Sequence, residues 1–545
     1  MRKTGLAAVA ALIAGGMVPG DALAFDGKPS PDAASARCGA LAGLRLADTS
    51  IVSAALVPAK AAETSVAGET PGHRSFCRVV ARVRQAPDSD IGVEIWLPVQ
   101  GWTGVFHGNG NGGFAGVLAG GYSGMADGLR RGFATATTDT GTAPASPLEG
   151  EALIGRPRAW RDWARLSTHV MTTTGKAITK AFYGREARRS YYTGCSTGGQ
   201  QGLIESLYYP ADYDGILVGA PVINRTWGHA AVLWDHAAAH RTPGSLLSVA
   251  KLKLLNKAAI ATCWRQGHGL AGDRFVSDPL SCTFDPAVLQ CRGPASDACL
   301  TASEVATAKA FYSGPTNRDG KATYFGWLPG SETPDAYGWS FLQTPINGQP
   351  PFGALFKWVF GADWDWKGFD FDRDMPAVDA RLDPIVNDAT RGSLDAFVAR
   401  GGKLIIYHGL ADTLVAPGQS VAFYERQARE LGEGRDLADS ARLFLVPGMM
   451  HCGGGTGPDA FNATLGIPPR PPVDDARHDI FAALIAWTER GEAPDHIIAT
   501  KFSSEDAGRI DMQRPLCPYP QKAMYRGSGS TRSASNFTCA GPNDR

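Results

Sequence analysis

Short apolar runs recur along this chain, and segments with the apolar period of a helix separate them. A short apolar run bounded by glycine or polar residues is typical of a buried strand, whereas apolar residues at i, i+3 and i+4 indicate an amphipathic helix. The runs predict strands over residues 92–97, 104–107, 133–137, 190–193, 215–219, 403–408 and 442–446. The helical period is clearest over residues 162–183, 199–208 and 419–430. This alternation predicts an α/β fold, with a mostly parallel sheet and helices on both faces.

The middle of the chain interrupts this alternation. Residues 221–383 are rich in glycine, proline and aromatic residues, and they separate the strand at 215–219 from the strand at 403–408. A chain of 545 residues also exceeds one compact domain, so a second unit is expected. We therefore expect residues 221–383 to form an inserted lid domain, and residues 25–220 and 384–545 to form the catalytic domain.

The first residues have the pattern of a signal peptide. Arg2 and Lys3 precede a short apolar stretch, and Ala22-Leu23-Ala24 matches the small-residue cleavage site. No apolar run approaches the ~18 residues that a membrane span needs. The ten cysteines, an even number, fit an oxidising compartment. We expect residues 1–24 to be removed and the mature chain to be exported to the periplasm or the extracellular space, without a membrane partner.

The charge balance argues against several partners. Lysine plus arginine and aspartate plus glutamate both count 53, so the formal net charge is zero. A neutral chain gives no reason to expect nucleic acid or an anionic membrane surface as a partner. No Cys-x-x-Cys pair or close histidine and cysteine cluster is present, so a zinc site is not expected.

The predicted strand at 190–193 runs directly into Gly194-Cys195-Ser196-Thr197-Gly198-Gly199, and a predicted helix follows. Gly-x-Ser-x-Gly arises by chance in a chain with 66 glycines. Between a strand and a helix, however, it forms a sharp turn that exposes the serine hydroxyl. We predict that Ser196 is a nucleophile for acyl transfer; the alternative is a purely structural turn.

A nucleophilic serine needs a base and an orienting carboxylate, and in this fold they follow the serine in the order acid, then histidine. Asp412 comes just after the predicted strand at 403–408, and His451 lies on a glycine-rich loop after the strand at 442–446. We predict that Asp412 orients His451 and that His451 lies within hydrogen-bond reach of the Ser196 hydroxyl. The alternatives are a helix-capping role for Asp412 and His408 as the base.

Two cysteines adjoin these predicted catalytic residues, because Cys195 precedes Ser196 and Cys452 follows His451. A disulfide between them would hold their Cα atoms within about 4.4–6.8 Å. Ser196 and His451 could then meet, although they are far apart in the sequence.

The Cys-Ser and His-Cys pairs, with an aspartate between them, resemble the tannase and feruloyl esterase family. Residues 194–199, 407–412 and 446–452 match its pattern closely, and residues 110–116 and 514–520 support the match. The resemblance covers nearly the whole mature chain. It implies an α/β-hydrolase fold with a large inserted lid domain, and a serine esterase that hydrolyses aromatic carboxylic esters.

The resemblance also implies particular pairs and donors. It implies the disulfides Cys38–Cys77, Cys195–Cys452, Cys263–Cys282, Cys291–Cys299 and Cys517–Cys539. An oxyanion hole needs two hydrogen-bond donors, and one is normally the backbone N–H after the nucleophile, here Thr197. The resemblance assigns the other donor to Gly113, in a glycine-rich loop after the strand at 104–107. That loop lacks the Gly-Lys-Ser/Thr ending of a phosphate-binding loop.

Lids of this family usually carry a calcium loop rich in aspartates. The corresponding residues here, 263–278, keep only Asp273 and Asp278, and a tryptophan stands in place of the first aspartate. Calcium prefers six or more oxygen ligands. We therefore expect no cofactor to be required and name Asp273 and Asp278 only as weak calcium candidates.

The expected partner is a small aromatic ester, carried by plant polysaccharide or tannin. Aromatic residues of the lid could pack on the aromatic acid or simply form the lid core. These candidates are Trp327, Trp339, Phe341, Phe352 and Trp358. The sequence does not decide between feruloyl and galloyl esters. The alternatives are an acyltransferase that uses a sugar or phenolic acceptor, and a non-catalytic protein that binds phenolics.

Overall fold

A computed structural model describes residues 31–541, except for residues 61, 62, 66, 67, 71, 72, 143–146, 336, 433, 464–469 and 507. The signal peptide expected at residues 1–24 lies outside the described residues. Across the described part of the chain, every helix is too short or too polar to cross a lipid bilayer.

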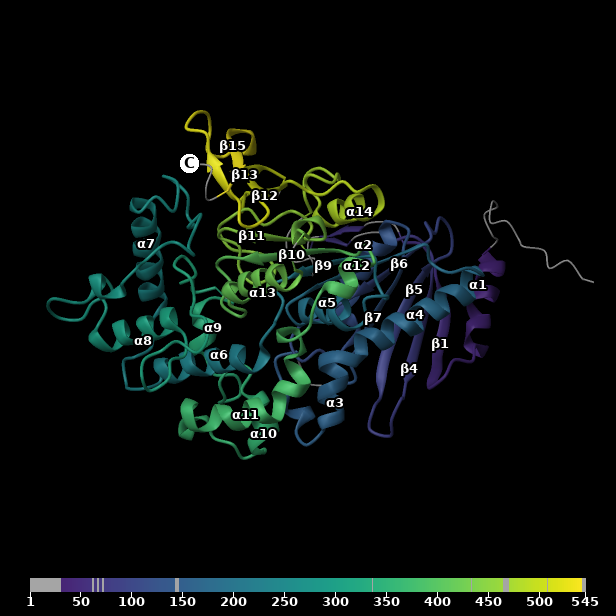
Figure 1. The fold of residues 1–545 in the computed structure, drawn as a ribbon, viewed down its shortest axis with the longest axis horizontal. Helices are drawn as coiled ribbons and strands as arrows, with labels where there is room; N and C mark the ends of the chain where they lie inside the picture. Colours follow the sequence, from purple (N-terminus) through teal and green to yellow (C-terminus); the bar gives the residue numbers. More distant parts are fainter. Residues whose placement is uncertain are drawn as a thin grey trace, which may run out of the picture.

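A nine-stranded sheet forms the centre of the molecule (Figure 1), with the strand order β1-β4-β5-β7-β6-β8-β9-β10-β11. The strands are β1 (Thr49–Val57), β4 (Phe76–Val83), β5 (Ile91–Pro98), β6 (Val105–Asn109), β7 (Ala134–Thr138), β8 (Arg189–Cys195), β9 (Gly215–Gly219), β10 (Lys403–Gly409) and β11 (Ala441–Val446). Neighbours are parallel from β7 to β11. The neighbours β1, β4, β5 and β7 are antiparallel. The sheet is therefore mixed, and every predicted strand lies in it.

Helices cover both faces of the sheet. They are α1 (Pro31–Ala40), α2 (Tyr122–Arg130), α4 (Ser167–Tyr183), α5 (Thr197–Tyr208), α12 (Asp395–Ala399), α13 (Pro417–Glu430) and α14 (Ile480–Arg490). The short helix α3 (Pro157–Arg161) contacts α11 (Phe371–Val386) instead. Successive side chains of a strand point to opposite faces. In β9, Ile216 and Val218 join the apolar core with α4, α5 and α13, whereas Leu217 joins the core with α14. The strands are apolar on both faces because both faces are covered.

The chain between β9 and β10 forms a separate group of helices beside the sheet (Figure 1). They are α6 (Arg225–Ala239), α7 (Val249–Arg265), α8 (Ala302–Ser313), α9 (Trp339–Gln343), α10 (Ala354–Phe360) and α11 (Phe371–Val386). One apolar cluster is largely internal to this group. A second cluster joins α10 and α11 to Trp160 of α3 and to Phe114, so the group packs against the sheet-bearing part.

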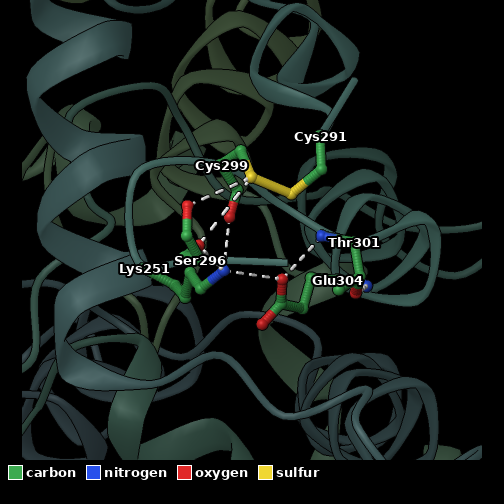
Figure 2. Close-up of a disulfide and its surroundings, with 6 residues drawn as sticks. All are labelled: Lys251, Cys291, Ser296, Cys299, Thr301 and Glu304. Atoms are coloured by element: carbon green, nitrogen blue, oxygen red, sulfur yellow. Dashed lines mark hydrogen bonds and ion pairs between the residues drawn. A yellow bond between two sulfur atoms is a disulfide. The ribbon is translucent and has the colours of Figure 1, made fainter. Parts of the chain in front are cut away.

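One corner of this group contains a buried ion pair and a disulfide that closes a short loop (Figure 2). Lys251 Nζ lies 3.2 Å from Glu304 Oε2 and donates to Ser296 O at 2.7 Å. Glu304 also closes a capping box with Thr301 at the start of α8. The disulfide Cys291–Cys299 closes a loop directly beside these groups. These contacts all lie within residues 251–304, so this corner of the helix group is held by its own residues.

The C-terminal residues add two small antiparallel sheets that the sequence pattern did not predict. The first pairs β12 (Ile497–Phe502) with β13 (Ile510–Leu516), and the second pairs β14 (Lys522–Tyr525) with β15 (Phe537–Ala540). A further hairpin pairs β2 (Glu63–Ser65) with β3 (Gly68–Thr70).

All ten cysteines form disulfides. The bonds are Cys38–Cys77, Cys195–Cys452, Cys263–Cys282, Cys291–Cys299 and Cys517–Cys539, the five pairs that the resemblance implies. Four of them join residues 8 to 39 apart in the sequence, whereas Cys195 and Cys452 are 257 apart. Only this last bond links distant strand ends of the sheet.

Candidate active site

Ser196 occupies a strained turn between β8 and α5. Its φ of 63° and ψ of −121° lie in a region that residues with side chains rarely adopt. Such a conformation costs on the order of 1–3 kcal/mol and persists only where the surroundings hold it. Here the Ser196 N–H donates to Gly219 O at 3.0 Å, and Ser196 O accepts from Gln200 N at 3.0 Å. The predicted elbow is present, with the half-buried serine at its apex.

The elbow touches the glycine-rich loop after β6 through backbone atoms. Gly198 N donates to Asn111 O at 2.6 Å. A Cβ atom on Gly198 would lie 2.8 Å from the same carbonyl oxygen, and a Cβ atom on Gly113 would lie 2.0 Å from Pro147 O. Real side chains do not fit at such distances, and the φ of +55° at Gly113 also favours glycine. These two positions must be glycine for the loops to meet.

Asp412 and His451 lie after neighbouring strands and contact each other. His451 Nδ1 lies 2.7 Å from Asp412 Oδ2. The other carboxylate oxygen accepts from the backbone N–H groups of Leu414 and Val415 at 2.8 and 3.0 Å. Burial opposes ionisation of this fully buried carboxyl, but the nearby His451 and His408 hold the pKa of Asp412 well below its usual value. Asp412 is therefore an ionised group suited to orient an imidazole. It is not the cap of α13, whose N-cap is Ala416.

The ring of His408 is engaged elsewhere. His408 is fully buried, its Nδ1 lies 2.7 Å from Ser420 Oγ, and its Nε2 lies 2.9 Å from Val415 O. The same Nε2 lies 3.3 Å from Asp412 Oδ2. His408 is thus a buried neighbour of the acid, and His451 is the histidine with a ring nitrogen left for other chemistry.

The disulfide Cys195–Cys452 joins the serine turn to the histidine loop, with 6.0 Å between the two Cα atoms. Within the described part of the chain, the hydrogen bond of the His451 ring goes to Asp412, and none joins it to Ser196 Oγ. This differs from the expected direct contact. Catalytic hydrogen bonds in free enzymes are often long and tighten only with substrate bound. The disulfide therefore holds the two loops together without a hydrogen bond between the two side chains.

The two expected oxyanion donors, Gly113 and Thr197, lie next to each other beside the serine turn. Among the described residues, neither Gly113 N–H nor Thr197 N–H donates to a protein acceptor. The Gly113 carbonyl oxygen accepts hydrogen bonds from Thr197 Oγ1 at 2.7 Å and from Trp163 Nε1 at 3.3 Å. Arg225 in turn donates to Thr197 Oγ1 at 3.1 Å. The sequence analysis missed Trp163 and Arg225, because nothing nearby in the sequence distinguishes them from ordinary helix residues.

The five candidate aromatic residues fall into two groups. Trp327 and Trp339 are buried in the lid core, where their indole N–H groups donate to Asp235 and Ser331. Trp358 is also buried; it stacks on Trp160 and donates to Gly150 O. By contrast, Phe341 and Phe352 are only partly buried, and their ring centroids are 5.9 Å apart.

Phe352 links this aromatic pair to the glycine-rich loop. Its ring centroid lies 6.4 Å from that of Phe114, the residue after Gly113. It also stacks on His229 of α6 at 5.0 Å. Trp358 lies nearer to Phe114, with 5.5 Å between the ring centroids, but it is buried. Phe352 is therefore the partly exposed aromatic residue beside the candidate oxyanion loop, and Phe341 adjoins Phe352.

The two candidate calcium ligands both have cationic partners. Asp273 accepts two hydrogen bonds from Arg514 Nη2, at 3.0 and 3.1 Å, and both side chains are buried. Asp278 Oδ2 lies 2.5 Å from Lys522 Nζ. These ion pairs join the lid loop to the C-terminal sheets and occupy the carboxylates that calcium would need.

Comparisons with known proteins show which family and fold this chain is similar to. A family model described as Tannase and feruloyl esterase matches residues 77–540. The chain is 37% identical over 536 residues to an uncharacterised esterase of Xanthomonas campestris pv. campestris, covering 93% of this chain and 91% of that protein. It is 32% identical over 473 residues to a probable feruloyl esterase B-2 of Aspergillus terreus, covering 85% and 86%. The crystal structure of feruloyl esterase B from Aspergillus oryzae matches with a TM-score of 0.81 and 27% identity, covering 93% of this chain and 100% of that one. These likenesses and the mixed sheet confirm the α/β-hydrolase fold.

Proposed function

This chain belongs to the tannase and feruloyl esterase family and is a carboxylic ester hydrolase, and from that premise we propose that it cleaves aromatic esters through Ser196, His451 and Asp412. The observation that carries the proposal is the contact of 2.7 Å between His451 Nδ1 and the ionised Asp412. The loop that holds His451 is also joined to the serine turn by the disulfide Cys195–Cys452. Nucleophile, acid and base then follow β8, β10 and β11, which belong to one run of four neighbouring parallel strands, β8 to β11.

In the first half of the reaction, Ser196 Oγ attacks the ester carbonyl while His451 Nε2 takes its proton. Asp412 keeps the proton on Nδ1, so that Nε2 is the free acceptor, and it stabilises the imidazolium that forms. The carbonyl oxygen becomes an oxyanion, which accepts from the Gly113 and Thr197 N–H groups. His451 then returns the proton to the leaving alcohol, and an acyl-enzyme remains on Ser196.

In the second half, His451 takes a proton from water, whose oxygen attacks the acyl carbonyl. The same two N–H groups donate to the second oxyanion. His451 then returns its proton to Ser196 Oγ as the carboxylic acid leaves. An alcohol in place of water would give a new ester. The same residues would thus serve an acyltransferase, and no contact of the described residues favours that outcome.

The substrate class follows from the aromatic pair beside the site. Phe341 and Phe352 offer partly exposed ring faces next to the oxyanion loop, which suits the aromatic ring of a feruloyl or galloyl group. We assign no substrate contact to Trp327, Trp339 or Trp358, because their rings are buried. Residues 221–383 act in this proposal as the lid domain that carries the aromatic pair.

Five disulfides and no free cysteine among the described residues support export to an oxidising compartment. The expected setting is therefore the periplasm or the extracellular space, where esters of plant polysaccharides and tannins are met.

The test is a set of esters assayed with purified protein: methyl ferulate, methyl gallate and chlorogenate, each with and without an added alcohol acceptor. We expect acid release from at least one aromatic ester, and a fluorophosphonate should label Ser196, as located by peptide mass spectrometry. Labelling of another residue would contradict the assigned nucleophile. Ester formation that exceeds hydrolysis at low acceptor concentration would favour the acyltransferase.

A further inference from the structure

A buried arginine of the lid contacts the residues that hold the candidate oxyanion loop. Arg225 is the first residue of α6 and is 3% exposed. Its Nη2 donates to Thr197 Oγ1 at 3.1 Å and also contacts Gln200 Oε1, and its Nε donates to Gln200 Oε1 at 3.0 Å. Thr197 and Gln200 lie in the first turn of α5, directly after the nucleophile. The lid thus reaches the serine turn through one guanidinium group.

This guanidinium has no counter-charge. Among the described residues, no carboxylate forms an ion pair with Arg225, although arginines elsewhere in the chain commonly do. Instead, its Cζ lies 4.5 Å from the ring centroid of Trp163. Burial lowers the pKa of Arg225 to about 9. A buried, unpaired charge is costly in a folded protein. Such a charge is expected where it serves a negative charge that appears only during a reaction.

The contacts of Arg225 converge on Gly113. Because Thr197 Oγ1 accepts from Arg225, its own proton is directed to Gly113 O, which lies 2.7 Å away. Trp163, the residue under the guanidinium, donates to the same carbonyl at 3.3 Å. On the other side, Phe114 N donates to Pro147 O at 2.7 Å. Gly113 is therefore held by contacts on both sides. Two of the side chains that hold it, Thr197 and Trp163, also contact Arg225.

We propose that Arg225 is a positioning residue of the oxyanion hole: it orders the Thr197 and Trp163 side chains that hold Gly113, and its unneutralised charge favours the oxyanion over the neutral ester. This inference rests on the proposed function, because it assumes that Gly113 and Thr197 bind the oxyanion. A residue that only anchored the lid would affect stability and substrate binding. A residue that favours the oxyanion affects kcat and the binding of anionic tetrahedral adducts.

The experiment compares Arg225→Met, Arg225→Lys and the control Arg381→Met. Arg381 also lies over a tryptophan, with its Cζ 5.6 Å from the ring of Trp160, and has no contact with Thr197. Each variant is assayed for kcat and KM on the best aromatic ester. Inhibition by an arylboronic acid is measured as well. Ser196 Oγ bonds to its boron, the hydroxyl proton passes to His451, and the boronate carries the negative charge.

We expect Arg225→Met to lower kcat by about 10- to 100-fold and to weaken boronate binding by a similar factor, with little change in KM, because losing one oxyanion donor outright costs about 100- to 1,000-fold. Arg225→Lys should retain part of the wild-type kcat and part of the boronate affinity. Arg381→Met should match the wild type in both quantities. Unchanged kcat and boronate affinity in Arg225→Met, or a loss confined to KM and Tm, would overturn the inference.

Two further outcomes are decisive. If Arg225→Met does not fold, Thr197→Val takes its place: it removes the hydroxyl between Arg225 and Gly113 and should show the same selective loss of kcat. The loss should be larger than in Thr197→Ser, which keeps a hydroxyl. Wild-type kcat in Thr197→Val would overturn the inference. If the wild-type protein hydrolyses no aromatic ester, the proposed function is wrong. That outcome is distinct from a failure of the inference about Arg225.

Discussion

The sheet and the lid hold the proposed site by different means. Ser196, Asp412 and His451 follow the strands β8, β10 and β11, so backbone geometry sets where they lie. The lid contributes side chains, Phe341, Phe352 and Arg225, whose positions depend on packing and single hydrogen bonds. In the proposed function, the sheet therefore sets the reaction type, whereas the lid, whose side chains are held by packing and hydrogen bonds, sets the choice of substrate.

The disulfides show the same contrast. The bond that serves the site crosses 257 residues and joins two loops of the sheet. The two bonds of the lid close loops of 19 and 8 residues and stabilise only their own surroundings. We therefore expect changes in the sheet half to affect kcat, and changes in the lid, apart from those at Arg225, to affect KM or Tm.

The largest effect is expected from Ser196→Ala. Removing the nucleophilic hydroxyl should lower kcat by about 10⁵- to 10⁶-fold, since hydrolysis then relies on binding and the oxyanion donors alone. Tm, followed by circular dichroism, should not fall, because the strained turn gains no new side chain. Residual turnover above about a thousandth of the wild-type rate would contradict covalent catalysis by Ser196.

Asp412→Asn should lower kcat by about 10⁴-fold, because an amide no longer selects the His451 tautomer with a free Nε2. The pKa of Asp412 is held below its usual value, so the stability it contributes is complete above about pH 4 and is lost as the pH falls further. Asp412→Asn should therefore lose this acid-side dependence of Tm. A variant that keeps more than a tenth of wild-type kcat would mean that another group orients His451.

Removing Cys195–Cys452 by a double change to alanine should lower kcat by about 100-fold, because a base misplaced by about 1 Å costs that much. The matched control is the double change of Cys291 and Cys299. Loss of the Cys291–Cys299 bond should lower the free energy of unfolding by about 2–3 kcal/mol and leave kcat unchanged. Full kcat without Cys195–Cys452, or failure of that variant to fold, would show that the long bond has another role.

Phe352→Ala should raise KM for aromatic esters by about 10-fold, because one exposed ring face is lost from the proposed aromatic pair. Hydrolysis of an acetate ester should change little. The control is Phe360→Ala, at the exposed end of α10, where the side chain is 39% exposed. An equal loss on acetate and aromatic esters would indicate that Phe352 supports the fold of the lid and not the acyl group.

The smallest effect is expected from removing calcium. Asp273 and Asp278 are paired with Arg514 and Lys522, so EDTA should shift Tm by less than about 2 °C. A fall of many degrees that added calcium reverses would show that these carboxylates bind the ion in preference to their basic partners.

The catalytic half of the fold could be predicted because its strands are buried on both faces and read as apolar runs. Strand β8 and helix α5, which flank Ser196, are examples. The edge strand β1 was missed because none of its residues is buried and their burial lacks a clear alternation. Helix α11 was missed because Pro376 and Pro384 lie inside it.

Within the site, the residues that carry motifs could be predicted, and those that carry only contacts could not. Ser196, Asp412 and His451 each follow a recognisable strand, whereas Arg225 becomes meaningful only when α6 packs against α5. The separation of Ser196 Oγ from the His451 ring depends on side-chain rotation, which no sequence pattern encodes.

The glycine contact between the serine turn and the loop after β6 bears on how this protein can diversify. Gly113 and Gly198 meet neighbouring carbonyl groups with no room for a Cβ atom. A substitution at Gly113 or Gly198 therefore cannot adjust the spacing between the two proposed oxyanion donors. The spacing is either kept or lost. New specificities, whether selected in nature or in the laboratory, are expected to accumulate in residues 221–383, while the backbone around the serine stays invariant.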